Sequence, residues 1–211
     1  MNPKPLTDNV KVQIFTANED HFKYAEEICQ TIEDAAKVRG TGIAKREPEY
    51  IKSKMREGKA VIALTENGEF AGFCYIESWG KEKNFVANSG LIVKSQFRSM
   101  GLGKMIKKAA FELSRKKFPT AKLFGITTSP AVMKINYELG YRPVTFAQLT
   151  DDEDFWKGCE SCVNFDILKR TNYKHCLCTA MLFDPEEKAK HQQNSTKDQV
   201  KYEQEKSSVS L

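Results

Sequence analysis

The segment Gln96-Phe97-Arg98-Ser99-Met100-Gly101-Leu102-Gly103-Lys104 decides the fold, because it connects a predicted strand to a predicted helix. The first amides of a helix have no acceptor inside it, and the positive end of the helix dipole lies at them. Gly101 and Gly103 lack the Cβ atoms that would hold an anion away from these amides. The segment therefore predicts a pyrophosphate-binding loop, with Arg98 and Lys104 adding positive charge at its rim.

Other interpretations of the two glycines compete with this one. The glycines also fit a tight turn that binds nothing. A dinucleotide-binding fold would carry a third glycine and an acidic residue about twenty positions later, after the first strand rather than the fourth. A Walker-type loop ends in Gly-Lys-Ser/Thr, whereas Gly103-Lys104 is followed by Met105.

Strands and helices are predicted on both sides of the loop. Asn67-Gly68 between two alternating segments predicts a β-hairpin. Strands that alternate with helices in the second half imply crossovers and parallel pairing, so the sheet is mixed and the fold class is α/β (mixed α+β). The predicted strands are 10–15, 60–66, 69–79, 85–93, 121–128 and 142–147, and the predicted helices are 20–38, 48–57, 103–117 and 131–139.

The composition limits the classes of protein to which this chain can belong. The chain has 211 residues, 40% hydrophobic and 29% charged, with a net charge of +5. It lacks the roughly 20 consecutive apolar residues of a membrane span, and its first residues lack the apolar core of a signal peptide. The basic residues are spread along the chain, whereas a nucleic-acid binder concentrates them. We therefore expect a cytoplasmic protein with no membrane or nucleic-acid partner.

The chain is predicted to contain one domain and two further regions. Residues 1–150 hold the predicted strands and helices, and the length is too short for two domains of ordinary size. Residues 151–183 form a cysteine-containing extension that we expect to pack on the domain. Residues 184–211 are charged and poor in large apolar groups, which predicts a disordered tail.

Two motifs carry a resemblance to a known family. Arg98-x-x-Gly101-x-Gly103, after a strand ending in Leu-Ile-Val, resembles the signature of the GCN5-related N-acetyltransferases, the GNAT superfamily. A second segment about thirty residues later, Ser129 to Tyr141 followed by Arg142-Pro143, is similar to the family's second signature, which ends in leucine, glycine and an aromatic residue. The resemblance implies a central mixed sheet in which two strands splay apart, and an acyl-CoA-dependent acyltransferase.

The resemblance also implies how the coenzyme is held. The pantetheine arm of acetyl-CoA would pair with the backbone of Leu91, Ile92 and Val93, and an amide there would hold the acyl carbonyl as the amine attacks. The backbone amides of Met100, Gly101, Leu102, Gly103 and Lys104 would bind the pyrophosphate. Succinyl-CoA in place of acetyl-CoA stays open at this point.

Direct aminolysis of a thioester needs a base for the attacking amine and can use a donor for the leaving thiolate. Glu77, and Asn88 or Ser89, are the candidates on the third and fourth strands for the base. A solvated carboxylate at a strand end is the competing interpretation of Glu77. The family often places a tyrosine donor where this chain has Asn136, which can hydrogen-bond the sulfur or the pantetheine. Tyr137 follows it, rotated by about 100° on the helix.

The resemblance places the acceptor over the first two helices and their connection. There the cations Arg39, Lys45 and Arg46 can bind a carboxylate or can form an ordinary solvated loop. The chain looks like short bacterial GNAT proteins associated with arginine biosynthesis (N-acetylglutamate synthase-like), which suggests the α-amine of glutamate as the acceptor. A protein or peptide acetyltransferase and a non-catalytic acyl-CoA sensor are the alternatives. A homodimer is compatible with each of these functions.

The extension contains two cysteine pairs. Cys159 and Cys162 are separated by thirteen residues from Cys176 and Cys178. Four thiolates at such spacing can bind a structural zinc ion. Small buried thiols without metal are the alternative, because cysteine is among the most buried residue types.

Overall fold

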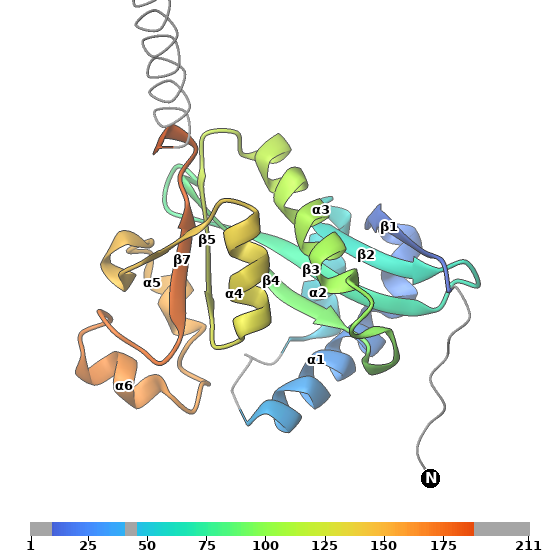
Figure 1. Cartoon of the computed structure of the whole chain (residues 1–211), viewed down its shortest axis with the longest axis horizontal. Helices are drawn as coiled ribbons and strands as arrows, with labels where there is room; N and C mark the ends of the chain where they lie inside the picture. The colour runs from blue at the N-terminus through green and yellow to red at the C-terminus, as the bar shows by residue number, and fades with distance from the viewer. Residues whose placement is uncertain (1–9, 41–45, 188–211) are drawn as a thin grey trace, which may run out of the picture.

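A computed structural model describes residues 10–40 and 46–187, apart from the side chain of Arg39. Its centre is one seven-stranded mixed sheet with the strand order β1-β2-β3-β4-β5-β7-β6 (Figure 1). The sheet and its covering helices confirm the predicted α/β (mixed α+β) class with a GNAT-type arrangement. The strands are β1 (Val12–Thr16), β2 (Ala60–Thr65), β3 (Phe70–Trp79), β4 (Phe85–Val93), β5 (Lys122–Thr127), β6 (Arg142–Val144) and β7 (Thr179–Phe183).

Local sequence signals set the ends of the helices. Ser129 accepts a hydrogen bond from the Val132 amide and Pro130 occupies the first turn of α4. Pro48 likewise begins α2, and Gly40, with φ of 62°, ends α1. The helices are α1 (Ala25–Arg39), α2 (Pro48–Arg56), α3 (Leu102–Lys117), α4 (Pro130–Glu138), α5 (Glu153–Lys157) and α6 (Phe165–Arg170), with 3₁₀ turns at Glu19–Tyr24, Ser95–Phe97 and Phe146–Gln148.

The first four strands pair antiparallel in chain order, with β2 and β3 joined by the predicted hairpin. β4 and β5 form the one parallel pair among the described strands, and α3 makes the crossover between them. β7 pairs antiparallel with both β5 and β6. Residues 179–183, which belong by sequence to the extension, therefore form a strand inside the sheet.

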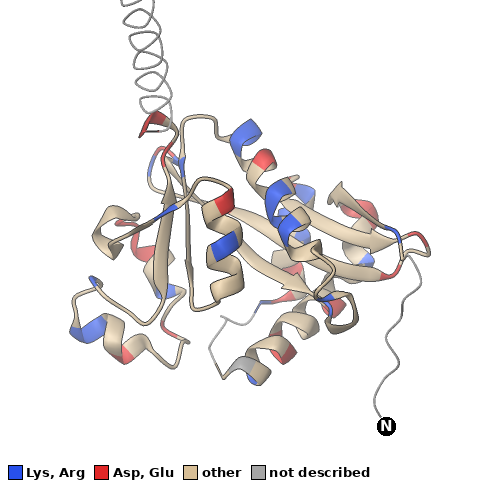
Figure 2. Cartoon of the chain, in the orientation of Figure 1, with Lys and Arg blue, Asp and Glu red and all other residues tan. Residues whose placement is uncertain are grey.

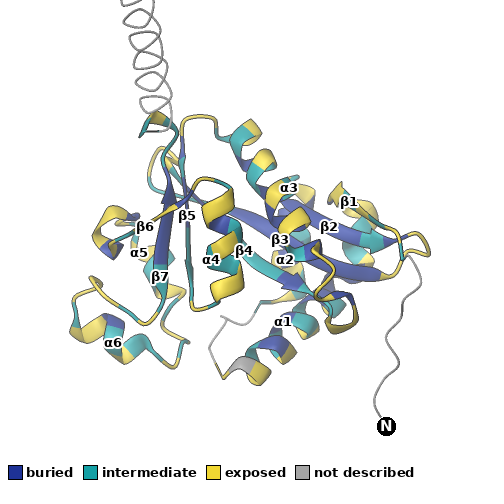
Figure 3. Cartoon of the chain, viewed as in Figure 1, coloured by how far each residue is buried: buried dark blue, intermediate teal, exposed yellow. Residues whose placement is uncertain are grey.

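The two faces of the sheet are covered by different helices. α3 and α4 pack on one face, where Cys74, Val86 and Leu123 point. α1 and α2 cover the β1–β4 half of the opposite face, against Phe73 and Ile92 among others. α5, α6 and the cysteine segment cover the other half of that opposite face. Figure 3 shows the buried strands between these layers and the exposed outer sides of α3 and α4.

None of the helices in residues 10–40 and 46–187 is long and apolar enough to cross a membrane.

Most predicted elements agree with the observed ones to within two residues at each end. The largest differences are the first helix, which begins as a 3₁₀ turn, and β6, which ends at Val144 rather than at 147. The predicted tail from 188 onward, like residues 1–9, lies outside the described residues.

Candidate active site

The sheet opens between its two parallel strands. β4 and β5 pair only from Phe85 to Ala87, opposite Lys122 to Phe124, although both strands continue. Beyond Ala87 the described structure contains no pairing of β4 with β5, and the two strands diverge in Figure 1. We call the point where pairing stops the vertex. Beyond it, the β5-facing edge of β4 at Leu91, Ile92 and Val93 has the unpaired geometry that the resemblance implied.

A bulge in β4 contributes to this opening. Tyr75 is paired with Ser89 but Phe73 with Ile92, so β4 carries an extra residue at this point. Gly90 lies in the bulge with φ of 63°, and a Cβ atom there would lie 2.5 Å from Cε1 of Tyr75. Both the backbone conformation and the close ring require glycine. The bulge thus fixes where the edge of β4 turns away from β5.

The predicted pyrophosphate loop lies just past the end of β4. Gly101 is the N-cap of α3 with φ of 77° and no side-chain cap, and space around its missing Cβ is open. Among the described residues, no hydrogen bond is donated by the amides of residues 99–103. The Lys104 amide differs from expectation, because it donates to the Gly101 carbonyl at 3.1 Å. Five successive amides remain available to an anion.

The two predicted cations lie at the rim of this loop. Arg98 donates from Nε to the Val93 carbonyl at 3.1 Å, so its side chain follows the end of β4. Lys104 pairs with Glu138 of α4 at 2.8 Å, and that hydrogen bond lowers the pKa of Glu138. Figure 2 shows further basic residues on α3 and α4 beside the loop. This end of the sheet therefore presents positive charge where phosphates would lie.

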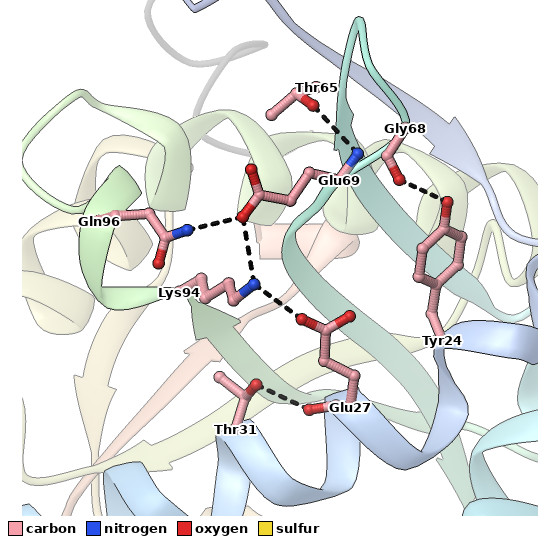
Figure 4. A network of polar contacts seen from close by, with 8 residues as sticks. All are labelled: Tyr24, Glu27, Thr31, Thr65, Gly68, Glu69, Lys94 and Gln96. Carbon is pink, nitrogen blue, oxygen red and sulfur yellow. Dashed lines mark hydrogen bonds and ion pairs between the residues drawn. The ribbon is translucent and has the colours of Figure 1, made fainter. Parts of the chain in front are cut away.

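A polar network holds the start of the loop (Figure 4). The Lys94 ammonium lies 2.8 Å from the Glu27 carboxylate of α1 and 3.2 Å from Glu69 in the hairpin. Gln96 donates to the same Glu69 at 2.6 Å. Tyr24 donates to the Gly68 carbonyl of the hairpin at 2.7 Å. The loop is thus tied to α1 and to the hairpin by contacts that the sequence pattern did not indicate.

Glu77 lies on the sheet face that α1 and α2 cover. Its carboxylate is 2.8 and 2.9 Å from the Lys54 ammonium and accepts a hydrogen bond from the Tyr50 hydroxyl. The Glu77 side chain is 14% exposed, so it is not the solvated strand-end carboxylate of the competing interpretation. Burial, followed by the neighbouring Tyr75 and Glu77, raises the pKa of Tyr50, which therefore stays a neutral donor.

Arg46 lies beside Glu77 on the same face. Its Nε donates to the Tyr75 hydroxyl at 2.7 Å. The guanidinium carbon lies 5.8 Å from the Tyr50 ring centroid and 5.9 Å from that of Tyr75, distances typical of cation–π contact. Of the other two predicted acceptor cations, Lys45 lies outside the described residues, as does the side chain of Arg39.

The other two predicted catalytic residues lie on the opposite face. Asn88, the first β4 residue past the vertex, donates to the Ser114 hydroxyl of α3 at 2.7 Å and accepts from Tyr141 at 3.3 Å. Asn136 of α4 is 1% exposed, and its amide oxygen has no hydrogen-bond partner among the described residues. Tyr137 is 72% exposed and points elsewhere, as the helical rotation predicted. The sheet therefore separates Glu77 from Asn88 and Asn136.

One further residue near the vertex was not identified from the sequence. Lys107 of α3 is 2% exposed, and its ammonium lies 5.4 Å from the Tyr141 ring centroid. Its position between Ile106 and Lys108 on a basic helix gave no signal of burial. A lysine on the apolar face of an amphipathic helix is the pattern that could have indicated it.

The expected zinc site is not supported. Among residues 10–40 and 46–187 no group of three or more His, Cys, Asp or Glu is arranged to hold a metal ion. Burial, and to a smaller extent the neighbouring thiols, raises the pKa of Cys159 to about 11 and that of Cys178 to about 12. Cys176 points to the Asn164 carbonyl at 3.9 Å. Cys159, Cys176 and Cys178 pack in an apolar cluster with Leu168 and Trp156.

Comparison with known proteins gives the class of this protein. The model of the Acetyltransferase (GNAT) family matches residues 29–130, which contain α2, β2 to β5, the bulge and the loop. This region resembles the GNAT acetyltransferases, which indicates an N-acetyltransferase that works with a CoA thioester. No curated protein matches the chain by sequence.

Solved structures share the fold at low sequence identity. N-acetylglutamate synthase from Neisseria gonorrhoeae, complexed with coenzyme A and N-acetylglutamate, is 14% identical with a TM-score of 0.57, over 84% of this chain and 36% of that one. yncA from Salmonella typhimurium, with its cofactor acetyl-CoA, is 11% identical with a TM-score of 0.55, over 84% and 95%. A GNAT acetyltransferase from Staphylococcus aureus is 15% identical with a TM-score of 0.55, over 67% and 91%. The chain thus spans about a third of the N-acetylglutamate synthase.

Proposed function

We propose that this acetyltransferase moves the acetyl group of acetyl-CoA to the α-amine of a small amino acid such as glutamate. The observation that carries the proposal is the vertex. There the unpaired edge of β4 leads to the five free amides of the loop. The Glu77 carboxylate and the Arg46 guanidinium lie on the opposite face of the sheet. A thioester that passes through the opening would meet an amine from the other face.

The coenzyme would approach from the side of α3 and α4. The amides of residues 99–103 would bind the pyrophosphate, with Arg98 and Lys104 at the rim. Lys104 would exchange its Glu138 partner for a phosphate oxygen, which is a small cost because both side chains are substantially exposed. The pantetheine would add to the free edge of β4 at Leu91, Ile92 and Val93, as a peptide adds to an exposed strand.

Glu77 is the base that this arrangement favours over Asn88. An amide side chain has no useful basicity, and Asn88 lies on the coenzyme face. The Glu77 carboxylate lies on the acceptor face with Lys54 and Tyr50 as partners. Because Lys54 and Tyr50 occupy its oxygens, Glu77 would act through a water molecule that relays the proton of the ammonium.

Arg46 supports an amino acid as the acceptor. It is a cation on the same face as Glu77, and guanidinium groups bind carboxylates in a bidentate manner. The fold shared with an N-acetylglutamate synthase is compatible with such an acceptor. The extension borders this face as well, since Trp79 of β3 contacts Phe155 of α5 with centroids 5.5 Å apart. The extension would thereby limit acceptor size.

Release of free thiol from acetyl-CoA, measured across a panel of amino acids and peptides, tests the proposal. We expect turnover with glutamate or a similar acid, and a rise in KM for that acceptor in Arg46→Gln. Arg56→Gln is the matched control, because Arg56 of α2 pairs at the surface with Glu19 at 3.6 Å. Turnover on peptides alone would indicate a protein acetyltransferase, and binding of CoA without thiol release would indicate a sensor. Succinyl-CoA belongs in the same panel.

A further inference from the structure

Four polar side chains converge at the vertex from four different elements. Asn88 comes from β4 and Tyr141 from the start of β6, joined by their 3.3 Å hydrogen bond. Lys107 comes from α3 and lies over the Tyr141 ring. Asn136 comes from α4 and lies against Gly125, where a Cβ atom would be 3.7 Å from Nδ2. The neighbouring residues are apolar, among them Val86, Leu123 and Met181.

Two of the four are left with unused hydrogen-bonding capacity. The amide oxygen of Asn136 is buried and has no partner among the described residues. The Lys107 ammonium likewise forms no hydrogen bond or ion pair within the described part of the chain, although the residue is 2% exposed. Buried polar groups are nearly always satisfied, and a buried unpaired charge is costly. Both groups therefore keep hydrogen-bonding capacity that a ligand at the vertex could use.

Lys107 faces two titratable groups, and both are neutral at ordinary pH. From β3 it faces Cys74, whose pKa burial raises to about 11. From β6 it faces Tyr141, whose pKa burial also raises. Arg115, on α3 itself, is the remaining charged group that acts on Tyr141. Burial among these groups lowers the pKa of Lys107 to about 8, so near pH 7 it still carries a proton that it can readily donate.

We propose that Lys107 donates the proton to the departing thiolate of CoA, in place of the tyrosine that this chain lacks at Asn136. This inference rests on the proposed function, and it adds the residue that protonates the leaving thiolate. Lys107 lies at the vertex on the α3 face, from which the coenzyme would enter. Asn136 would hold the sulfur or the adjacent pantetheine amide with its free oxygen and its NH₂ group.

In the tetrahedral adduct the C–S bond breaks and its electron pair goes to sulfur while the C=O bond of the new amide forms. One N–H proton of Lys107 passes to that sulfur, which leaves as the CoA thiol. The proton lost by the attacking nitrogen passes through a water molecule to the Glu77 carboxylate on the other face. Neutral Lys107 then takes a proton from solvent after the product leaves. The pKa of Lys107, about 8, is close to that of an ordinary thiol, about 8.5, so the proton can pass to sulfur at little cost in free energy.

The first test does not need turnover. Coenzyme A bound to the wild-type protein is titrated by following the ultraviolet absorbance of its thiolate. We expect the bound thiol to ionise at lower pH than free CoA, because a cation lies beside it, and we expect Lys107→Met to abolish that shift. A shift that persists in Lys107→Met would overturn the inference.

The second test measures acetyl transfer against pH. The wild-type kcat should fall as pH rises through the Lys107 pKa, and Lys107→Met should lower kcat by about 100-fold and remove that fall. Lys107→Arg keeps the charge but holds its proton too tightly, so it should keep the thiolate shift and still lose kcat. Lys108→Met is the control, since Lys108 is the next residue of α3 and is exposed. An unchanged pH profile in Lys107→Met would contradict the proposal.

The failure of this inference is distinguishable from failure of the proposed function. Calorimetry with CoA on the wild-type protein reports whether the coenzyme binds at all. Absence of binding would refute the proposed function and this inference together. Binding and turnover that are equally strong in wild type and Lys107→Met would refute only the role of Lys107.

Discussion

At the scale of single residues, Gly101 combines two requirements that only glycine meets well. Its φ of 77° lies in the left-handed region, and its open side leaves room for an anion beside the first amides of α3. Ser99 also has a positive φ, 64°, so two of the loop residues are held in a conformation that side chains disfavour. At Ser99, which is not a glycine, this conformation stores backbone strain beside the unpaired amides.

Gly101→Val should weaken CoA binding by tenfold or more and reduce stability by about 1 to 2 kcal/mol, because a β-branched residue is disfavoured in the left-handed region. Calorimetry with CoA and a thermal melt measure the two effects. Gly101→Asn is the matched variant, since asparagine tolerates that region, and it should keep most of the stability. Equal CoA affinity in all three proteins would remove the loop from the coenzyme site.

The burial of Lys107 predicts that the free energy of unfolding depends on pH. Its pKa is about 8 in the fold, lowered from an ordinary value of 10.5 by burial. Between these values the unfolded chain holds a proton that the folded one has lost, so stability rises with pH from about 8 to about 10.5. Lys107→Met should therefore stabilise the fold near pH 7, by on the order of 2 to 4 kcal/mol.

Thermal or denaturant unfolding at several pH values checks this. The advantage of Lys107→Met over wild type should shrink as pH rises through the interval, whereas Lys108→Met should show no such trend. A gain of stability that accompanies a loss of acetyl transfer is the usual signature of a group retained for activity. A destabilised Lys107→Met would mean that the burial cost of the ammonium is small.

At the scale of elements, α2 is joined to β3 by a nearly buried ion pair. The Lys54 side chain is 9% exposed and that of Glu77 is 14% exposed. Lys54→Met would leave the carboxylate with the Tyr50 hydroxyl as its main partner, and breaking such pairs costs about 3 to 5 kcal/mol when fully buried. We expect a loss of about 2 to 3 kcal/mol in chemical denaturation, given the residual exposure. Lys52→Met, which removes the more exposed pair with Glu49, should cost much less.

The network around Glu69 is expected to matter less for stability than for coenzyme binding. Its ion pair with Lys94 joins side chains that are 46% and 25% exposed, so Glu69→Gln should change stability by less than about 1 kcal/mol. CoA affinity should nevertheless fall several-fold, because Lys94 and Gln96 hold the start of the loop (Figure 4). Glu66→Gln, at the exposed pair with Lys11, is the control. Unchanged CoA affinity in Glu69→Gln would show that the loop keeps its shape without the network.

At the scale of the whole molecule, the extension completes the sheet. β7 lies between β5 and β6 and pairs with both, and Ala180, Met181 and Leu182 are each 2% exposed. A chain ending at residue 150 would leave β5 and β6 without their partner strand and expose this apolar surface. We expect residues 1–150 alone to be poorly folded by circular dichroism. A cooperative thermal melt of that fragment would contradict this prediction.

Features of this fold and site that depend on a few neighbouring residues could be predicted from the sequence, whereas features that depend on contacts between distant segments could not. The hairpin at Asn67-Gly68, the start of α2 at Pro48 and the glycine loop are all set by the backbone preferences of a few neighbouring residues. They were therefore predicted, and the fold class with them. The placement of Asn88 and Glu77 on opposite faces follows from the pairing of β3 with β4, in which Glu77 lies opposite Ala87 and Ile76 lies opposite Asn88. No pattern within β4 alone indicates it.

The sequence by itself determined the order of strands and helices as far as β6 and the phosphate-loop motif, because each depends on periodicity or on contiguous residues, and its two motifs carried the resemblance to the GNAT transferases. Only the tertiary structure decided that β7 enters the sheet, that Lys107 is buried beside Tyr141, and that the four cysteines do not form a metal site. These are relations between segments far apart in the chain. Their energy comes from packing and desolvation, which exist only once the chain has folded.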